Sequence, residues 1–175
     1  VDLLESLGNP IYKIASFEIN HIPLLKKVAR TGKPVIMSTG ASSISEIEEA
    51  VLTLNENGCN DLVLFKCTST YPTSPIDCHL NTIPHLKKLF NCEVGLSDHT
   101  LGIGVSLAAI ALGATYIEKH FCLSRTNGGV DSDFSMEPDE MRRLVNESKN
   151  VSLSLGKVHY GLTKSESNVS AGKRS

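Results

Sequence analysis

The stretch GLSDHTLGIGVSLAAIALGATYIEKHF, Gly95–Phe121, decides the fold class of this chain. Short apolar runs near its two ends, Glu93–Ser97 and Ala114–Glu118, predict buried strands, and the small apolar segment Val105–Leu112 between them predicts a helix. A strand, a helix and a second strand in sequence form a βαβ unit, in which the two strands run parallel and the crossover is right-handed. The sequence therefore predicts an α/β protein.

The same alternation of strand and helix continues toward the N-terminus. Apolar residues recur at helical spacing from Leu24 to Ala29, from Ile44 to Leu54 and from Ile83 to Leu89. Around these helices lie three further β-branched runs that predict strands, Ile11–Ser16, Pro34–Thr39 and Leu62–Cys67. The chain is thus predicted to contain five βα units.

Capping signals predict where two of the helices begin and end. Ser45 and Glu48 have the spacing of a capping box, in which a hydroxyl and a carboxylate accept hydrogen bonds from free backbone N–H groups. Gly58 is placed to end that helix. Pro138 predicts the start of a last helix that runs toward Leu155, because proline is favoured in a first helical turn.

Polar side chains follow every predicted strand, and this decides between two architectures. In an open doubly wound sheet, functional groups gather at one switch point, whereas in a barrel the carboxyl ends of all strands face a shared mouth. The strand-end residues are Lys13, Ser16 and Glu18; Ser38 and Thr39; Lys66, Thr68 and Ser69; Ser97, Asp98 and His99; and Glu118, Lys119 and His120. This pattern favours a (β/α)₈ TIM barrel over an open sheet. The barrel is expected to be incomplete, because a complete one needs roughly 250 residues.

Composition narrows the classes of partner. The net charge is -2, with acidic and basic residues interleaved, so neither nucleic acid nor an acidic membrane is an expected partner. Five cysteines without a C-x-x-C pair predict neither a disulfide framework nor a zinc knuckle, and fit a reducing cytoplasm. No apolar run approaches the roughly 20 residues that span a bilayer. A small-molecule ligand is therefore favoured.

Two histidines are the candidates for metal binding. His99 and His120 each come just after one of two consecutive strands, where neighbouring loops converge and two imidazoles could hold one divalent ion. The alternative is that each histidine is a polar loop residue or a hydrogen-bonded cap. Asp98, Glu118 and Asp131 are carboxylates nearby in sequence, but successive strand residues point to opposite faces, so Asp98 and Glu118 need not join the histidines.

Two further patterns at the strand ends point to different chemistry. An ammonium and three hydroxyls form a plausible cradle for a phosphate or carboxylate; they belong to Lys13, Ser16, Ser38 and Ser97. Lys66 and Lys119 instead lie on predicted strands where the Schiff-base lysine of a barrel aldolase would lie. The residues alone leave both mechanisms open.

Six motifs, taken in order and spacing, resemble the sialic acid synthase family over nearly the whole chain. They are YKIASFEI (Tyr12–Ile19), GKPVIMSTG (Gly32–Gly40), KCTSTYP (Lys66–Pro72), GLSDHTLG (Gly95–Gly102), ALGATYIEKHF (Ala111–Phe121) and DSDFSMEPDE (Asp131–Glu140). The resemblance implies that these segments are the fourth to eighth strands of the family's barrel, followed by its last helix.

The resemblance also implies an activity, a transferase reaction that condenses phosphoenolpyruvate with an N-acetylated amino sugar and releases phosphate. His99 and His120 then correspond to the histidine ligands of a Mn²⁺ or Mg²⁺ ion, which acts as a Lewis acid. Further roles implied are phosphoenolpyruvate binding by Lys13, Ser16, Ser38 and Ser97, proton transfer by Glu18, and sugar binding by Tyr71 and Asp131. The stretch GGVDSDFSMEP (Gly128–Pro138) is more similar to the pseudaminic acid synthase branch than to the N-acetylneuraminate branch.

The resemblance predicts that part of the synthase lies outside this chain. Residues 1–160 correspond to a partial barrel domain, and residues 161–175 to a linker toward a small antifreeze-like domain. Asp2–Leu7 is typical of the tail of a helix, so we expect further chain before it. In the family, three earlier strands carry a glutamate that helps to hold the metal, and the whole protein is a homodimer. The isolated chain is expected to be inactive, and a sugar- or anion-binding fragment without activity is the non-enzymatic alternative.

Overall fold

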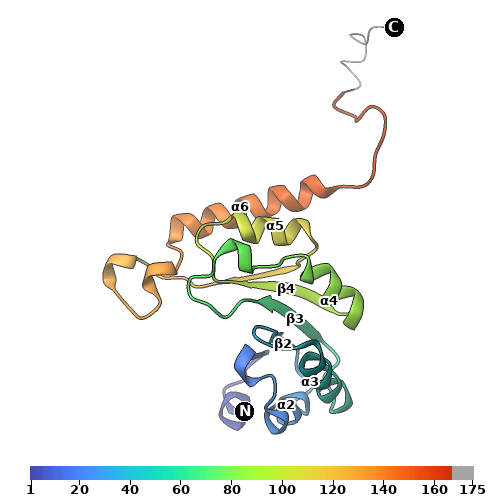
Figure 1. Ribbon diagram of the computed structural model, residues 1–175, viewed down its shortest axis with the longest axis vertical. Coiled ribbons are helices and arrows are strands. Elements are labelled where there is room, and N and C mark those ends of the chain that lie inside the picture. The colour runs from blue at the N-terminus through green and yellow to red at the C-terminus, as the bar shows by residue number, and fades with distance from the viewer. Residues whose placement is uncertain (167–175) are drawn as a thin grey trace.

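The computed structural model describes residues 1–166, which form one parallel sheet with helices along its outer side (Figure 1). The sheet has five strands in the order β1-β2-β3-β4-β5, the order in which they occur in the chain. Each strand therefore pairs with the next, with no reversal of order of the kind that defines a doubly wound sheet. The strands are β1 (Tyr12–Ile14), β2 (Val35–Ser38), β3 (Leu62–Cys67), β4 (Glu93–Asp98) and β5 (Tyr116–Lys119).

The sheet is strongly curled, as a part of a barrel must be. Lys13 lies on β1 and Glu118 on β5, at opposite edges of the sheet, yet the Lys13 ammonium is 2.8 Å from a Glu118 carboxylate oxygen. In a flat sheet, four interstrand spacings would separate these two strands by about 19 Å. The five strands thus form a curved half-barrel, and the predicted incomplete barrel is confirmed in this form.

Helices connect successive strands, as the sequence pattern predicts. Their bounds are α1 (Asp2–Ser6), α2 (Ile22–Ala29), α3 (Ile44–Glu56), α4 (Thr82–Phe90), α5 (Gly104–Ala111) and α6 (Pro138–Leu155). Short 3₁₀ helices occur in the loops, at Ser16–Glu18, Pro75–Asp77, Arg125–Asn127 and Ser132–Phe134. The predicted start and end of α6 are confirmed.

The predicted capping box of α3 is wrong by two residues. The helix begins at Ile44, so Ser43 is the residue that precedes its first turn. The Ser43 hydroxyl accepts from the Glu46 backbone N–H at 3.3 Å, and the Glu46 carboxylate accepts from the Ser43 N–H at 2.7 Å. Ser45 and Glu48 have the same spacing, but both lie inside the helix, after the residue that caps it. Gly58 follows the end of α3 with a positive φ of 109°, as expected.

The two faces of the sheet have different compositions. Side chains alternate between faces along each strand. On the outer face, Met37, Leu64 and Val94 are fully buried against apolar residues of the helices, such as Leu54 of α3 and Leu86 of α4. On the inner face the alternation places polar or aromatic side chains, which include Lys13, Phe65, Cys67, Ser97 and Glu118. The hydrophobic core therefore lies between sheet and helices, and the inner face carries the chemistry.

The end of the chain contributes little to this core. Gly161–Glu166 is exposed, and residues 167–175 of the predicted linker lie outside the described residues. No helix within residues 1–166 is long and apolar enough to cross a membrane.

Candidate active site

A polar row crosses the inner face of the sheet and joins three strands. Both carboxylate oxygens of Glu118 accept from Lys13, at 2.8 and 2.9 Å, and one also accepts from the Ser97 hydroxyl at 2.7 Å. The Lys13 ammonium lies 5.3 Å from the centre of the Phe65 ring. Burial alone would raise the pKa of Glu118, but the hydrogen bonds from Lys13 and Ser97 outweigh it and hold the pKa of the carboxyl below its usual value. Glu118 is therefore ionised at neutral pH and paired with the Lys13 ammonium.

The two predicted histidines meet at the carboxyl ends of β4 and β5. The ring centres of His99 and His120 are 5.4 Å apart, in an edge-to-face arrangement. The Tyr71 ring lies 4.2 Å from His99 and 5.7 Å from His120, and Phe134 lies 5.0 Å from His120. Asp131 reaches the same group, with a carboxylate oxygen 3.6 Å from His120 Nδ1. Tyr71, His99, His120 and Asp131 thus form one cluster, although the histidines come from different strands and the other two from different loops.

Backbone contacts fix the orientation of His99. Its Nδ1 lies 2.9 Å from the Thr68 carbonyl oxygen, which can only accept, so Nδ1 carries a proton. Nε2 faces the inner side of the sheet, 3.4 Å from the Ser97 hydroxyl. A histidine whose Nδ1–H is held by a backbone carbonyl presents Nε2 in a set direction, which is the usual arrangement of a metal-binding histidine.

Cys67, which is not among the residues predicted from the sequence, lies directly beside His99. It is 5% exposed at the end of β3. Burial raises the pKa of its thiol, but hydrogen bonds with His99 and Ser16 lower it to about 7. Burial lowers the pKa of His99, and the bonds with Cys67 and the Thr68 carbonyl more than compensate, so the pKa of the imidazole is raised. Cys67 lies at the end of β3, on the same face as Phe65, and this position in the sequence pattern could have indicated it.

Gly40 allows the backbone to pass close to the side chains of Ser16, Cys67 and Ser69. Its backbone N–H donates to the Ser16 hydroxyl at 3.0 Å. A Cβ at this position would lie only 2.8 Å from Ser16 Oγ and 3.1 Å from Cys67 Sγ, and it would also collide with Ser69 Oγ. Because Gly40 has no side chain, Ser16, Cys67 and Ser69 can all lie close to its backbone.

The remaining predicted residues lie in different surroundings. Ser38 is 3% exposed on the inner side of β2, in register with Phe65 of β3. Glu18 is exposed at the end of a short 3₁₀ helix, where its carboxylate accepts from the Ala15 backbone N–H at 3.1 Å. Ser38 thus shares the inner face with the polar row, whereas the Glu18 carboxylate is bonded within its own segment.

Two imidazoles contribute to a metal site without completing one. His99 Nε2 and the His120 ring are nitrogen donors of the kind that bind divalent transition metals. In the part of the chain that the structure describes, no group of three or more His, Cys, Asp and Glu residues is arranged to hold a metal ion. The residues present would fit a metal as two of its ligands, and no complete ligand set is formed within residues 1–166.

The lysines of the aldolase alternative do not face this group. Lys66 and Lys119 alternate with inner-face residues of β3 and β5 and so lie on the outer, helix-covered side of the sheet. Lys66 donates to the Cys67 carbonyl at 2.9 Å and to the Thr68 hydroxyl at 3.2 Å. Lys119 is paired with Asp98 at 3.0 Å, and both side chains are 1% exposed. Neither amine is placed to attack a ligand at the inner face.

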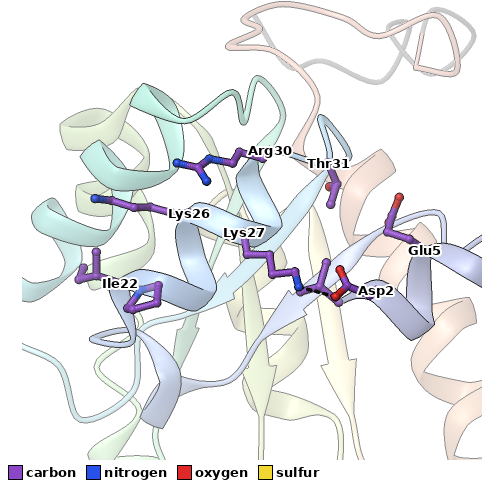
Figure 2. A pocket seen from close by; sticks show the side chains of 9 residues that line it. Asp2, Glu5, Ile22, Lys26, Lys27, Arg30 and Thr31 are labelled. Atoms are coloured by element: carbon purple, nitrogen blue, oxygen red, sulfur yellow. Dashed lines mark hydrogen bonds and ion pairs between the residues drawn. The ribbon is translucent and has the colours of Figure 1, made fainter.

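The groove in Figure 2 lies elsewhere, between α1 and α2 on the outer side of the structure. Lys26, Lys27 and Arg30 line it, and Lys27 is paired with Asp2 at 2.6 Å. The strand-end cluster of histidines is on the inner face, so this groove is separate from the candidate active site.

The fold and the site define the class of protein: half of a parallel βα barrel, with a histidine pair, a tyrosine and carboxylates at the carboxyl ends of its strands. More specifically, the chain belongs to the NeuB family, whose model matches residues 1–160. The predicted resemblance to the sialic acid synthases is confirmed.

Named relatives agree with this assignment. The chain is 43% identical over 168 residues to the N,N'-diacetyllegionaminic acid synthase of Campylobacter jejuni, covering 95% of this chain and 50% of that protein. It is 41% identical over 156 residues to the pseudaminic acid synthase of Helicobacter pylori, covering 89% of this chain and 46% of the relative. The crystal structure of N-acetylneuraminic acid synthetase from Leptospira borgpetersenii, in complex with citrate, superposes with a TM-score of 0.89 at 39% identity, covering 96% of this chain and 59% of that one. The chain spans about half the length of the curated relatives it matches.

Proposed function

We propose that this chain forms the later part of a synthase barrel that condenses phosphoenolpyruvate with an N-acetylated amino sugar to give a nonulosonic acid. In this assignment its strands β1 to β5 are the fourth to eighth strands of the barrel. The observation that carries the proposal is the convergence of His99, His120, Tyr71 and Asp131 on one side of the polar row formed by Lys13, Ser97 and Glu118. Membership of the NeuB family supports this condensation as the reaction carried out at that site.

The chemistry assigns complementary tasks to the two halves of the site. The C3 carbon of phosphoenolpyruvate forms a bond with the aldehyde carbon of the open-chain sugar, and the aldehyde oxygen takes a proton to become a hydroxyl. Water adds at C2 and loses one proton, which balances the proton taken up by the aldehyde oxygen. The C2–O bond to phosphate then breaks while the new C2 hydroxyl loses its proton to the departing phosphate, so that a ketone and inorganic phosphate remain. The protein must therefore bind one anion, hold one aldehyde near it and move protons between them.

The polar row suits the anion. The Lys13 ammonium and the hydroxyls of Ser16, Ser38 and Ser97 are the donors proposed for the carboxylate and phosphate of phosphoenolpyruvate. The Lys13 ammonium is paired with the Glu118 carboxylate, so an arriving anion would compete with that carboxylate for the ammonium. Glu18 stays the proposed proton-transfer group.

The histidine cluster suits the sugar. Asp131 is a hydrogen-bond acceptor for sugar hydroxyls, and Tyr71 offers a ring face and a hydroxyl. His99 and His120 are proposed to hold a Mn²⁺ or Mg²⁺ ion, which would supply Lewis-acid polarisation of the aldehyde. The sugar is proposed to be the pseudaminic acid precursor, on the sequence of the loop that carries Asp131 and Phe134, with the N-acetylneuraminate precursor as the alternative.

A chimaera tests the activity, because the chain spans about half of its relatives. The flanking parts of the H. pylori relative would be joined to this chain, and phosphate release from phosphoenolpyruvate measured with N-acetylmannosamine and with the pseudaminic and legionaminic acid precursor sugars, with and without Mn²⁺. We expect release that requires one sugar and Mn²⁺ and that His99→Ala and His120→Ala each abolish. His85→Ala, an exposed histidine on α4, is the matched control and should retain activity.

Folded chimaera that releases no phosphate with any sugar would contradict the proposal. A stable adduct on borohydride treatment with substrate would instead favour the Schiff-base aldolase, since only an imine is trapped in this way. Saturable binding of a sugar or anion without turnover would favour the non-enzymatic alternative. The complete protein is further proposed to be a homodimer, which sedimentation of that protein would test.

A further inference from the structure

A charged network lies behind the histidine pair, on the opposite face of the same two strands. Asp98 and Lys119 are in register on β4 and β5, and their side chains form an ion pair of 3.0 Å. Each side chain is 1% exposed. Asp98 immediately precedes His99, and Lys119 immediately precedes His120. The ion pair therefore connects the two strands one residue before each histidine.

Every polar atom of the pair is used to hold the loop after β4. One Asp98 oxygen accepts from the Thr100 backbone N–H at 2.8 Å and from the Thr100 hydroxyl at 2.7 Å. The other accepts from Ser106 in the first turn of α5 at 2.5 Å and from Lys119. Lys119 also donates to the Thr100 carbonyl at 2.7 Å. Both peptide groups of Thr100 are thereby fixed from opposite sides.

His99 is consequently held between two anchored residues. Asp98 and Thr100 flank it, and its own carbonyl accepts from the Thr73 N–H at 2.9 Å. On β5, His120 follows Lys119 directly, and its carbonyl accepts from the Met136 N–H at 2.9 Å. The backbone directions of both histidines are thus set by directional bonds, and the network is what links one to the other.

Stability alone is a poor reason for such a pair. Two charges removed from water lose hydration that their mutual attraction only partly restores, and well-packed apolar residues of similar size would be as stable or more so. What apolar residues cannot do is fix a peptide plane, because dispersion contacts have no direction. A buried network in which every partner is satisfied fixes one geometry.

We propose that Asp98 and Lys119 are positioning residues that set the separation and orientation of His99 and His120 through Thr100. They touch neither substrate nor metal and act through the backbone of the histidines. The inference rests on the proposed function only for what the histidines bind.

The test compares thermal stability with metal binding in the chimaera described above, with this chain in it either unaltered or altered, because the chain supplies only two of the proposed metal ligands. Asp98→Asn and Lys119→Met each leave one buried charge unpaired, whereas the double variant Asp98→Asn/Lys119→Met leaves none. We expect both single variants to lower the thermal midpoint and the double variant to recover most of the loss. Mn²⁺ binding, followed by electron paramagnetic resonance, should nevertheless be about 10-fold weaker in the double variant, as is typical when residues behind metal ligands are altered.

The matched control is Lys87→Met/Glu93→Gln, which removes an exposed ion pair of 2.9 Å beside the other end of β4. It should change neither the midpoint nor Mn²⁺ binding. A double variant at Asp98 and Lys119 that binds Mn²⁺ as tightly as the unaltered protein, whatever its stability, would overturn the proposal.

A second readout separates this inference from the proposed function. If the chimaera with the unaltered chain does not bind Mn²⁺, the metal proposed for the histidines is contradicted, and nuclear Overhauser contacts between the His99 and His120 rings then report their geometry directly. Contacts present in the unaltered chain and lost in the double variant would support the positioning role. Contacts that persist in both would refute it.

Discussion

Two ion pairs begin at neighbouring residues of β5 and differ in almost every respect. Glu118 pairs with Lys13 on the inner face, where the side chains are 42% and 36% exposed. Lys119 pairs with Asp98 on the outer face, where both are 1% exposed. One residue of displacement along a strand turns a side chain to the other face. The same strand therefore supplies a charge that a ligand can reach and a charge that only the protein uses.

The two pairs should also differ in energy. Exposed pairs stabilise proteins by about 0 to 1 kcal/mol, because water screens them and ordering the side chains costs entropy. Breaking a buried pair leaves an uncompensated charge without water, which costs about 3 to 5 kcal/mol. The inner pair is thus available for rearrangement by a ligand, and the outer pair is not.

The largest effect is expected from Lys119→Met, which leaves Asp98 buried without its cation. We expect a loss of about 3 to 5 kcal/mol in the free energy of unfolding, measured by urea denaturation. A loss below about 1 kcal/mol would mean that Asp98 is satisfied by Thr100 and Ser106 alone or is reached by water.

An intermediate effect is expected from Gly95→Ala, which tests how closely the inner face is packed. A Cβ at Gly95 would lie 2.6 Å from Cε1 of Phe65 and 2.8 Å from the Tyr116 carbonyl oxygen. We expect a loss of about 1 to 3 kcal/mol from such overpacking, again by urea denaturation. Gly104→Ala, where no atom lies within 4 Å of the new Cβ, is the control. Equal stabilities would show that Phe65 can move aside.

A small effect on stability is expected from Lys13→Met, although it removes the proposed anion-binding ammonium. The exposed pair with Glu118 should account for about 1 kcal/mol or less in a double-mutant cycle with Glu118→Gln. Binding of phosphoenolpyruvate, followed by calorimetry in the chimaera, should fall much further than stability does. If the coupling energy of Lys13 with Glu118 were as large as that of Lys119 with Asp98, the two ion pairs would not differ in energy as proposed.

The smallest effect is expected on the acid side of the stability curve. The pKa of Glu118 is lower in the folded chain than its ordinary value near 4.3. Its contribution is therefore complete above that ordinary value and disappears as the pH falls through the lower folded value. Glu118→Gln should flatten the stability curve slightly below about pH 4.5 and leave its slope at pH 6 to 8 unchanged. A change of slope near neutrality would indicate that another group is responsible.

Much of the framework could be predicted from local pattern. The positions of all five strands and the bounds of α6 followed from apolar periodicity and from Pro138. The capping box of α3 was misplaced because Ser43 with Glu46 and Ser45 with Glu48 have identical spacing, and only the position of the first helical turn distinguishes them. Periodicity locates a helix better than it locates its first residue.

The candidate site was predicted only in part. His99, His120, Tyr71 and Asp131 were singled out from the sequence and lie together in the structure, while their roles stay predictions. Cys67 was not singled out, and the face on which Glu118 lies was left undecided. Both lie on the inner face beside predicted residues, and the alternation that places them there depends on knowing which face is inner. That depends in turn on where the helices pack.

The sequence by itself determined the alternation of strands and helices and the polar residues at each strand end, because hydrophobic periodicity and turn chemistry act over a few residues. Only the tertiary structure decided that Lys13 meets Glu118 across 105 residues of chain, and that Lys119 meets Asp98 rather than a ligand. Those contacts depend on the curvature of the whole sheet and on which face the helices cover, and both are set by packing between distant segments.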